Sequence, residues 1–154
     1  MGIDVYDHLK SLQIALPAAP EPAANYSPSV VIDNTIYISG QTPKQGNQLI
    51  YVGKLGVNVS LEDGYAAARL CALRLLSAID AAVGDLNRIE KIIKITVYVN
   101  ASDDFTAHPQ VANGASDLFE QVLADRGLHA RATVGVSSLP SGAAVEVDLS
   151  AKVD

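Results

Sequence analysis

The chain is poor in several residue types on which particular functions depend: it has no tryptophan, one cysteine and only 18% charged residues. The single cysteine, Cys71, excludes an internal disulfide and is typical of a protein from a reducing compartment. It lies in the segment YAAARLCALRLLSAI, where a small apolar side chain at helical spacing is usually a core residue. The sequence therefore gives no reason to treat Cys71 as a nucleophile.

The motifs of metal, nucleotide and serine-hydrolase sites are also missing. The three histidines, His8, His108 and His129, are scattered and do not have the spacing of metal ligands. The sequence contains no glycine-rich phosphate loop and no Gly-x-Ser-x-Gly elbow. We interpret the histidines as surface residues and expect neither a metal nor a cofactor.

Positive charge is scarce as well. The net charge is −6 at pH 7, and no cluster of lysine or arginine interrupts the acidic field, which disfavours a nucleic-acid partner. The apolar runs are shorter than the about 20 residues that span a bilayer, and the first residues lack the pattern of a secretory signal. We therefore expect a cytoplasmic protein with no membrane partner.

The composition that is present favours one domain. A chain of 154 residues can bury about 70% of its unfolded surface in a single core. Because 49% of the residues are hydrophobic, we expect some apolar surface to lie in subunit contacts. Four prolines break up the N-terminal region: Pro17, Pro20, Pro22 and Pro28. We predict a short helix and a Pro-rich tether in residues 1–24 and a folded domain in residues 25–154.

Two helices are predicted inside this domain. Ser60 is a suitable N-cap, acidic residues occupy the next turn, and Gly84 fits the position just after the last turn. Apolar residues recur at helical spacing between these two ends. A second helix is expected over residues 106–125, although Pro109 and Gly114 weaken its first turns.

Runs of β-branched residues predict the strands. A hairpin of residues 30–32 and 35–39 turns at Asp33 and Asn34. Further strands are expected near 49–52, in 91–100 and, as a closing hairpin, near 131–137 and 143–151. This order predicts an α+β fold in which one mixed sheet carries two helices on a single face.

The closing hairpin places an arginine and a glutamate in an otherwise apolar pattern. If its turn pairs residues 138 and 143, Glu146 lies across from Gly135, with Arg131 and Thr133 on the same face. A guanidinium can bind a carboxylate through two hydrogen bonds, and a carboxylate can orient or deprotonate water. On the pattern alone, an ion pair of Arg131 with Asp148 or Glu146 on a solvated face is the simpler interpretation.

Three segments resemble the reactive intermediate deaminase A (RidA/YjgF) family: NYSPSVVIDNTIYISGQ, NGASDLFEQVL and HARATVGVSSLPSGAAVEVDLSAKV. The closing signature of that family is an arginine, then Leu-Pro, then a glutamate in a strand. Arg131, Leu139, Pro140 and Glu146 match its spacing without a gap. The resemblance extends over about residues 25 to 152.

This resemblance implies a chorismate-mutase-like fold, a homotrimer and a substrate cleft between subunits. It implies hydrolysis of 2-imino acids to 2-keto acids and ammonia, with small imino or keto acids as partners and no cofactor or metal. Arg131 would hold the substrate carboxylate and Glu146 would position the attacking water. The residues implied to shape the cleft or bind substrate are Tyr26, Ser39, Gly40, Asn113 and Thr133.

The sequence departs from common members of this family in two places. Thr133 stands two positions after the arginine, where many members have a cysteine, so thiol-dependent behaviour is not expected there. Residues 1–24 resemble those of a longer subgroup, in which the natural substrate and the role of the extension are open. The relative importance of Glu146 and Asp148 is open too.

Two other functions compete with deamination. The same fold can bind small carboxylates or keto acids without catalysis. Glu146→Gln distinguishes the two functions: if the carboxylate positions water, the variant loses deamination and largely keeps ligand binding. Members of the family are also often described as endoribonucleases or translation inhibitors. A net charge of −6 without a basic groove disfavours that activity.

Overall fold

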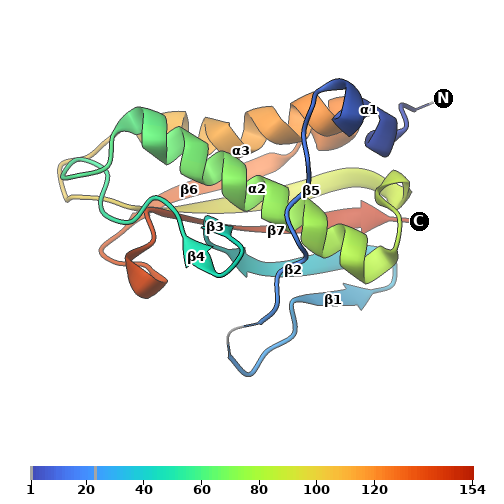
Figure 1. The fold of residues 1–154 in the computed structure, drawn as a ribbon, viewed down its shortest axis with the longest axis horizontal. Helices are drawn as coiled ribbons and strands as arrows, with labels where there is room; N and C mark the ends of the chain where they lie inside the picture. Colours follow the sequence, from blue (N-terminus) through green and yellow to red (C-terminus); the bar gives the residue numbers. More distant parts are fainter. Residues whose placement is uncertain (1, 23) are drawn as a thin grey trace.

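A five-stranded sheet with two long helices on one face forms the body of the protein in a computed structural model that describes residues 2–22 and 24–154 (Figure 1). The sheet consists of β1 (Ser29–Ile32), β2 (Thr35–Gln41), β5 (Ile89–Asn100), β6 (Ala130–Val136) and β7 (Val145–Val153). The helices are α1 (Val5–Ser11), α2 (Leu61–Val83) and α3 (His108–Leu123). A small separate hairpin consists of β3 (Lys44–Gln45) and β4 (Gln48–Leu49). Short 3₁₀ turns cover Leu86–Arg88, Ala124–Gly127 and Pro140–Gly142.

The strand order is β1-β2-β7-β5-β6, so the last two strands of the chain are not neighbours. The long strand β5 lies between them, parallel to β6 and antiparallel to β7. The predicted closing hairpin is therefore wrong, although both of its strands exist. The physical reason is that β7 finds two partners, β2 and β5, in the middle of the sheet, whereas β6 forms an edge. The first hairpin, which turns at Asp33 and Asn34, is confirmed.

Helix α2 begins and ends as its capping residues predict, whereas α3 begins without a side-chain cap and ends at Leu123. The Ser60 side chain accepts a hydrogen bond from the backbone of Asp63, and Gly84 ends α2 in the left-handed region at φ 82°. Pro109 occupies the first turn of α3, where its missing N–H costs nothing. Gly114 allows α3 to approach α2 closely, because a Cβ atom there would collide with the carbonyl oxygen of Tyr65.

The core lies between this helical layer and the sheet. Alternate residues of the central strands are fully buried on that side, among them Ile95, Val97 and Val147. The opposite face of the sheet carries Tyr37, Tyr98 and other partly exposed residues, and no helix of the described residues covers it. The mixed sheet with two helices on one face is confirmed.

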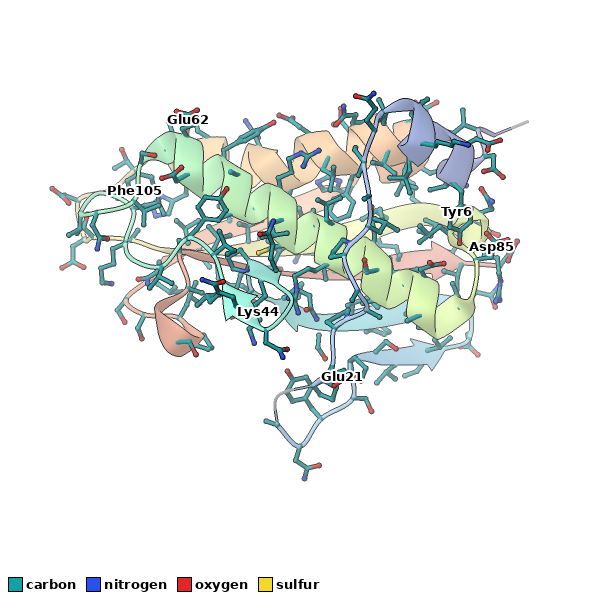
Figure 2. The ribbon with its side chains drawn as sticks, in the orientation of Figure 1. Tyr6, Glu21, Lys44, Glu62, Asp85 and Phe105 are labelled. Atoms are coloured by element: carbon teal, nitrogen blue, oxygen red, sulfur yellow. The ribbon has the colours of Figure 1, made fainter. Side chains whose placement is uncertain are left out.

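The N-terminal segment packs against the helices before it reaches the sheet. The Tyr6 hydroxyl donates to Asp80 Oδ1 at 2.6 Å and accepts from the backbone of Leu86 at 2.8 Å. In Figure 2, Tyr6 lies beside Asp85, at the end of the molecule where α2 stops. The chain then crosses α2, where Ser77 Oγ donates to the Pro17 carbonyl at 2.8 Å (Figure 1). Within the described residues, no helix has the length and apolar character needed to cross a membrane.

Candidate active site

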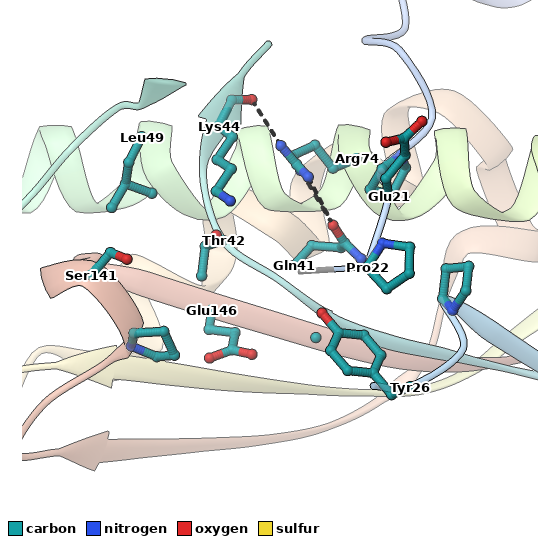
Figure 3. A pocket seen from close by; sticks show the side chains of 14 residues that line it. Glu21, Pro22, Tyr26, Gln41, Thr42, Lys44, Leu49, Arg74, Ser141 and Glu146 are labelled. Carbon is teal, nitrogen blue, oxygen red and sulfur yellow. Dashed lines mark hydrogen bonds between the residues drawn. The ribbon is translucent and has the colours of Figure 1, made fainter. Parts of the chain in front are cut away.

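Six of the seven residues predicted from the sequence to form a site fall into two groups, which lie on opposite faces of the sheet. The first group consists of Tyr26, Gly40 and Glu146, which line one cavity of about 160 Å³. We call this cavity the Glu146 pocket (Figure 3). The second group consists of Asn113, Arg131 and Thr133, which we call the Arg131 cluster. Strand register explains the separation: Glu146 lies beside Tyr98 on the bare face, and Arg131 lies beside Ile95 on the helix-covered face.

The Glu146 pocket forms where β2 leaves the sheet. A register shift between Ile38 and Gln41 bends the end of β2, next to the start of β7, which carries Glu146. Gly40 sits at this bend, and a Cβ atom there would collide with Glu146 Oε1. A glycine at this position therefore keeps space open for the carboxylate. Tyr26, which is 49% exposed, comes from the segment before β1.

The environment of Glu146 favours its protonated form. Burial raises the pKa of Glu146, and the negative charge of Asp148 two residues later raises it further. Asp148 in turn accepts a hydrogen bond from the Tyr98 hydroxyl at 3.1 Å. A carboxylate whose pKa is moved toward neutrality is a better proton acceptor than an ordinary surface glutamate.

Ser39 supports the pocket from outside. Its hydroxyl donates to the Ser27 carbonyl at 2.7 Å, and its backbone N–H donates to the Pro28 carbonyl at 3.0 Å. Both bonds hold the segment that carries Tyr26 against β2. Ser39 is not among the residues that line the cavity.

The Arg131 cluster is held together by α3. Arg131 Nη1 donates to Asn113 Oδ1 at 2.9 Å and to Ser116 Oγ at 3.1 Å. Within residues 2–22 and 24–154 the guanidinium forms no ion pair, so the alternative of a salt link to Glu146 or Asp148 is wrong. Thr133, on the same face of β6, has a buried hydroxyl that finds no hydrogen-bond partner in the described part of the chain.

His129 orients the Ser116 hydroxyl that contacts Arg131. His129 Nδ1 lies 2.6 Å from the Gly127 carbonyl, and its Nε2 lies 2.8 Å from Ser116 Oγ. Because a carbonyl only accepts, neutral His129 carries its proton on Nδ1, and Ser116 donates to Nε2 while it accepts from Arg131. Sequence reasoning missed this series of hydrogen bonds, since residues 116 and 129 share no short-range pattern.

The three histidines keep part of their surface exposed, as expected, but each also contacts neighbouring groups. Each is half-buried, and His8 Nδ1 lies 3.0 Å from the Val122 carbonyl. His108 packs edge-on against Phe105 with ring centroids 5.1 Å apart, and it fills the space beside Gly135. The predicted position of Gly135 opposite Glu146 is wrong, because its neighbour across the sheet is Val99.

Other residues that the sequence did not single out complete the pocket. Arg74 from α2 and Gln41 from the end of β2 are both buried and hydrogen-bonded to each other. Lys44 also lines the cavity. Within the described part of the chain, no three His, Cys, Asp or Glu side chains are grouped as metal ligands.

Comparison with known proteins connects these features to one family. Residues 7–153 match the family described as "YjgF/chorismate mutase-like, putative endoribonuclease". Protein TCP17 of Trypanosoma cruzi is 47% identical over 142 residues, which cover 92% of this chain and 89% of that protein. A 2-iminobutanoate/2-iminopropanoate deaminase of Dermatophagoides farinae is 25% identical over 88% of this chain and 91% of its own length.

The fold agrees with a solved structure as well. The crystal structure of Atu1372 from Agrobacterium tumefaciens, a protein of unknown function, superposes with a TM-score of 0.91 at 38% identity. The match covers 97% of this chain and 92% of that one. The predicted α+β, chorismate-mutase-like fold class is confirmed.

Proposed function

We propose that this chain, which belongs to the RidA/YjgF family, hydrolyses 2-imino acids to 2-keto acids and ammonia in a cleft that a second copy of the chain completes. The observation that carries the proposal is the half-buried Glu146 carboxylate, which lines a small cavity beside Gly40 and has a raised pKa. The family includes a relative named as a deaminase of this kind.

A single copy does not bring Arg131 and Glu146 together, because the sheet lies between them. Strand β6 is an edge strand, and the face of the sheet that carries Glu146 is bare. In our proposal the Arg131 cluster of one copy meets the Glu146 pocket of the next. Asn113 and Ser116 hold the guanidinium in place, which leaves its other N–H groups free for a substrate carboxylate. We propose a homotrimer as the closed assembly.

The chemistry needs only water and proton transfer. A water oxygen bonds to C2 of the imino acid, the C–N bond breaks, and the nitrogen leaves as ammonia with the protons that water supplied. Glu146 takes a proton from the attacking water and passes it toward the nitrogen, so atoms and charge balance. An imine carbon is already electrophilic. Catalysis therefore needs only a positioned water and a substrate carboxylate whose charge Arg131 neutralises. In the proposed cleft, Tyr26 and Thr133 contact the substrate.

The test is hydrolysis of 2-iminobutanoate, generated in situ by an amino-acid oxidase and competed by semicarbazide. Wild-type protein is expected to lower the yield of the semicarbazone. Glu146→Gln is expected to reduce the rate about 10²–10⁴-fold, as loss of a general base does. Arg131→Ala is expected to lose activity through a higher KM. Activity of either variant equal to that of the wild type contradicts the proposed roles.

Two variants serve as matched controls. Glu90→Gln removes a carboxylate that pairs with Lys152 at a distant part of the sheet, and Arg69→Gln removes an arginine from α2 outside the pocket. Both are expected to keep full activity.

The same variants separate the competing functions. A non-catalytic binder of keto acids predicts no hydrolysis by the wild type and equal binding of 2-oxobutanoate by Glu146→Gln. An endoribonuclease predicts RNA cleavage with a steep dependence on salt. The net charge of −6 disfavours the RNA function, and cleavage at physiological salt is the result that reverses this judgement.

A further inference from the structure

Arg74 is a buried cation for which the described chain offers no counter-ion. Its side chain projects from α2 into the Glu146 pocket, and the residue is only 9% exposed. It is the only charged residue among the buried polar residues of the described chain. No described carboxylate forms an ion pair with it. Burial of an unpaired charge is costly, so such a group is retained where something else uses it.

The partners of Arg74 are all neutral. Its Nε and Nη2 atoms donate to Gln41 Oε1 at 3.3 and 3.2 Å, and its Nη1 donates to the Lys44 carbonyl at 3.4 Å (Figure 3). Gln41 is itself oriented, because its Nε2 donates to the Ser39 carbonyl at 3.1 Å. A guanidinium has five N–H donors, and these bonds use three of them. One N–H on each terminal nitrogen is left, and both of these groups can donate to an anionic ligand.

Arg74 also stands where two cavities meet. It lines the Glu146 pocket and a second cavity of about 360 Å³, whose wall includes Pro17, Pro20 and Glu21 from the N-terminal segment. Lys44 lines both cavities and adds a second positive charge. Glu21 lines them too, but it does not pair with Arg74. In Figure 3, Arg74 and Gln41 lie next to α2, and Glu146 lies across the cavity on β7.

Glu146 and Arg74 act at different ends of this space. Burial lowers the pKa of Arg74, and the nearby Cys71 and Tyr26 side chains partly oppose this effect. The pKa of Glu146 is raised by burial and by the negative charge of Asp148. One end of the pocket therefore has a proton acceptor and the other end has a free cation.

We propose that Arg74, oriented by Gln41 and assisted by Lys44, binds a carboxylate at the end of the substrate's side chain, so that the preferred substrates are 2-imino dicarboxylic acids. This proposal rests on the proposed function, in which Arg131 of the neighbouring copy takes the carboxylate next to the imine carbon. The substrate then lies between two guanidinium groups, with its C2 atom beside Glu146. The N-terminal segment closes the outer wall of the side-chain end, which gives that segment a part in substrate selection.

The test compares two keto acids and two imino acids that differ by a side-chain carboxylate. Binding of 2-oxoglutarate and of 2-oxobutanoate is measured by calorimetry. Hydrolysis is measured on 2-iminoglutarate and 2-iminobutanoate, each generated in situ by an amino-acid oxidase. Wild-type protein is expected to prefer the dicarboxylate by about tenfold or more, the gain from one added charge-assisted contact. Arg74→Gln is expected to remove that preference, because it weakens binding of 2-oxoglutarate much more than binding of 2-oxobutanoate.

Control variants separate charge from folding. Arg69→Gln, on the same helix but outside both cavities, is expected to keep the wild-type preference. Lys44→Gln keeps the backbone carbonyl that Arg74 uses, and it is expected to weaken dicarboxylate binding more than 2-oxobutanoate binding. If Arg74→Gln does not fold, Arg74→Lys and Lys44→Gln replace it in the test. The proposal is overturned if neither variant reduces the preference for 2-oxoglutarate.

The outcomes distinguish the two proposals. If Arg74→Gln hydrolyses each imino acid at the same rate as the wild type, the Arg74 subsite is overturned and the deaminase function is not affected. Loss of 2-oxobutanoate binding in Arg74→Gln also overturns it, because Arg74 then holds the carboxylate next to C2. Arg74-dependent binding of 2-oxoglutarate without any hydrolysis supports the subsite and overturns the deaminase function.

Discussion

Glu146 and Arg74 share one property at the scale of single residues: each is at least partly withdrawn from water without gaining an ion pair. A protein that needs only stability replaces such groups by neutral ones, because an unpaired buried charge destabilises the fold. Their presence around one cavity is therefore an argument for function. By contrast, Cys71 is fully buried and burial raises the pKa of its thiol, which is the inert core role that the sequence predicts.

Replacement of Glu146 by glutamine is expected to raise stability at neutral pH while it removes activity. Burial raises the pKa of Glu146 above the model-peptide value of 4.5, so the folded protein binds a proton there more tightly than the unfolded chain does. Stability therefore falls as pH rises from the unfolded pKa through the folded pKa, and the loss is complete above both. Glutamine carries no charge and avoids this loss.

The measurement is Tm as a function of pH for wild type and Glu146→Gln. Since the carboxylate is only half-buried, solvent reduces the effect, and we expect a rise of only ~2 °C at pH 8. The difference is expected to shrink as pH falls toward 4.5. Glu90→Gln, which breaks an exposed ion pair with Lys152, is the control and is expected to show no rise. A lower Tm for Glu146→Gln at pH 8 contradicts the argument.

At the scale of helices and strands, local signals set the ends of each element, and packing sets its neighbours. The caps at Ser60 and Gly84 were predictable because they depend on a few adjacent residues. The separation of β6 from β7 was not predictable, because β5 is more than 30 residues earlier in the chain and enters between them. Gly114 also shows the difference between local signals and packing. It lowers helix propensity locally, yet it allows α2 and α3 to pack closely.

Gly114→Ala is therefore expected to destabilise the protein, against the sign that helix propensity predicts. Propensity alone favours alanine by about 1 kcal/mol in the middle of a helix. The added methyl group would collide with the Tyr65 carbonyl oxygen, which belongs to backbone and cannot rotate away. We expect a net loss of ~1–3 kcal/mol, measured by urea unfolding. The exposed Gln121→Ala on the same helix is the control with little change, and a more stable Gly114→Ala would contradict the close packing.

At the scale of the whole molecule, the chain exposes apolar surface that one copy leaves uncovered. Tyr37 on the bare face is 51% exposed, and Val31 and Ile32 on β1 are 50% and 59% exposed. Surface of this kind is typical of a subunit interface. Since Arg131 and Glu146 lie on opposite faces of the sheet, an assembly that covers the bare face is also the arrangement that can join them.

Mixing of two inactive variants tests this assembly. In a ring in which each cleft takes Arg131 from one copy and Glu146 from the next, co-refolded Arg131→Ala and Glu146→Gln chains regenerate intact clefts. With random mixing at equal amounts, about one cleft in four is intact, so about a quarter of wild-type activity is expected. Each variant refolded alone is expected to stay inactive. A mixture without activity, whose mixed assembly is verified by two affinity tags, contradicts a shared site.

The sequence by itself determined the helices α1, α2 and α3, the strands of the main sheet and the α+β class. It also determined the alternation that directs Val145, Val147 and Leu149 inward and Glu146 outward. These features depend on residues that are close in the chain. Only the tertiary structure decided which strands pair, and it thereby put Arg131 and Glu146 on opposite faces and placed Arg74 in the pocket with Glu146. The physical reason is that strand order and cavity walls result from contacts between residues far apart in sequence, for which local patterns carry no signal.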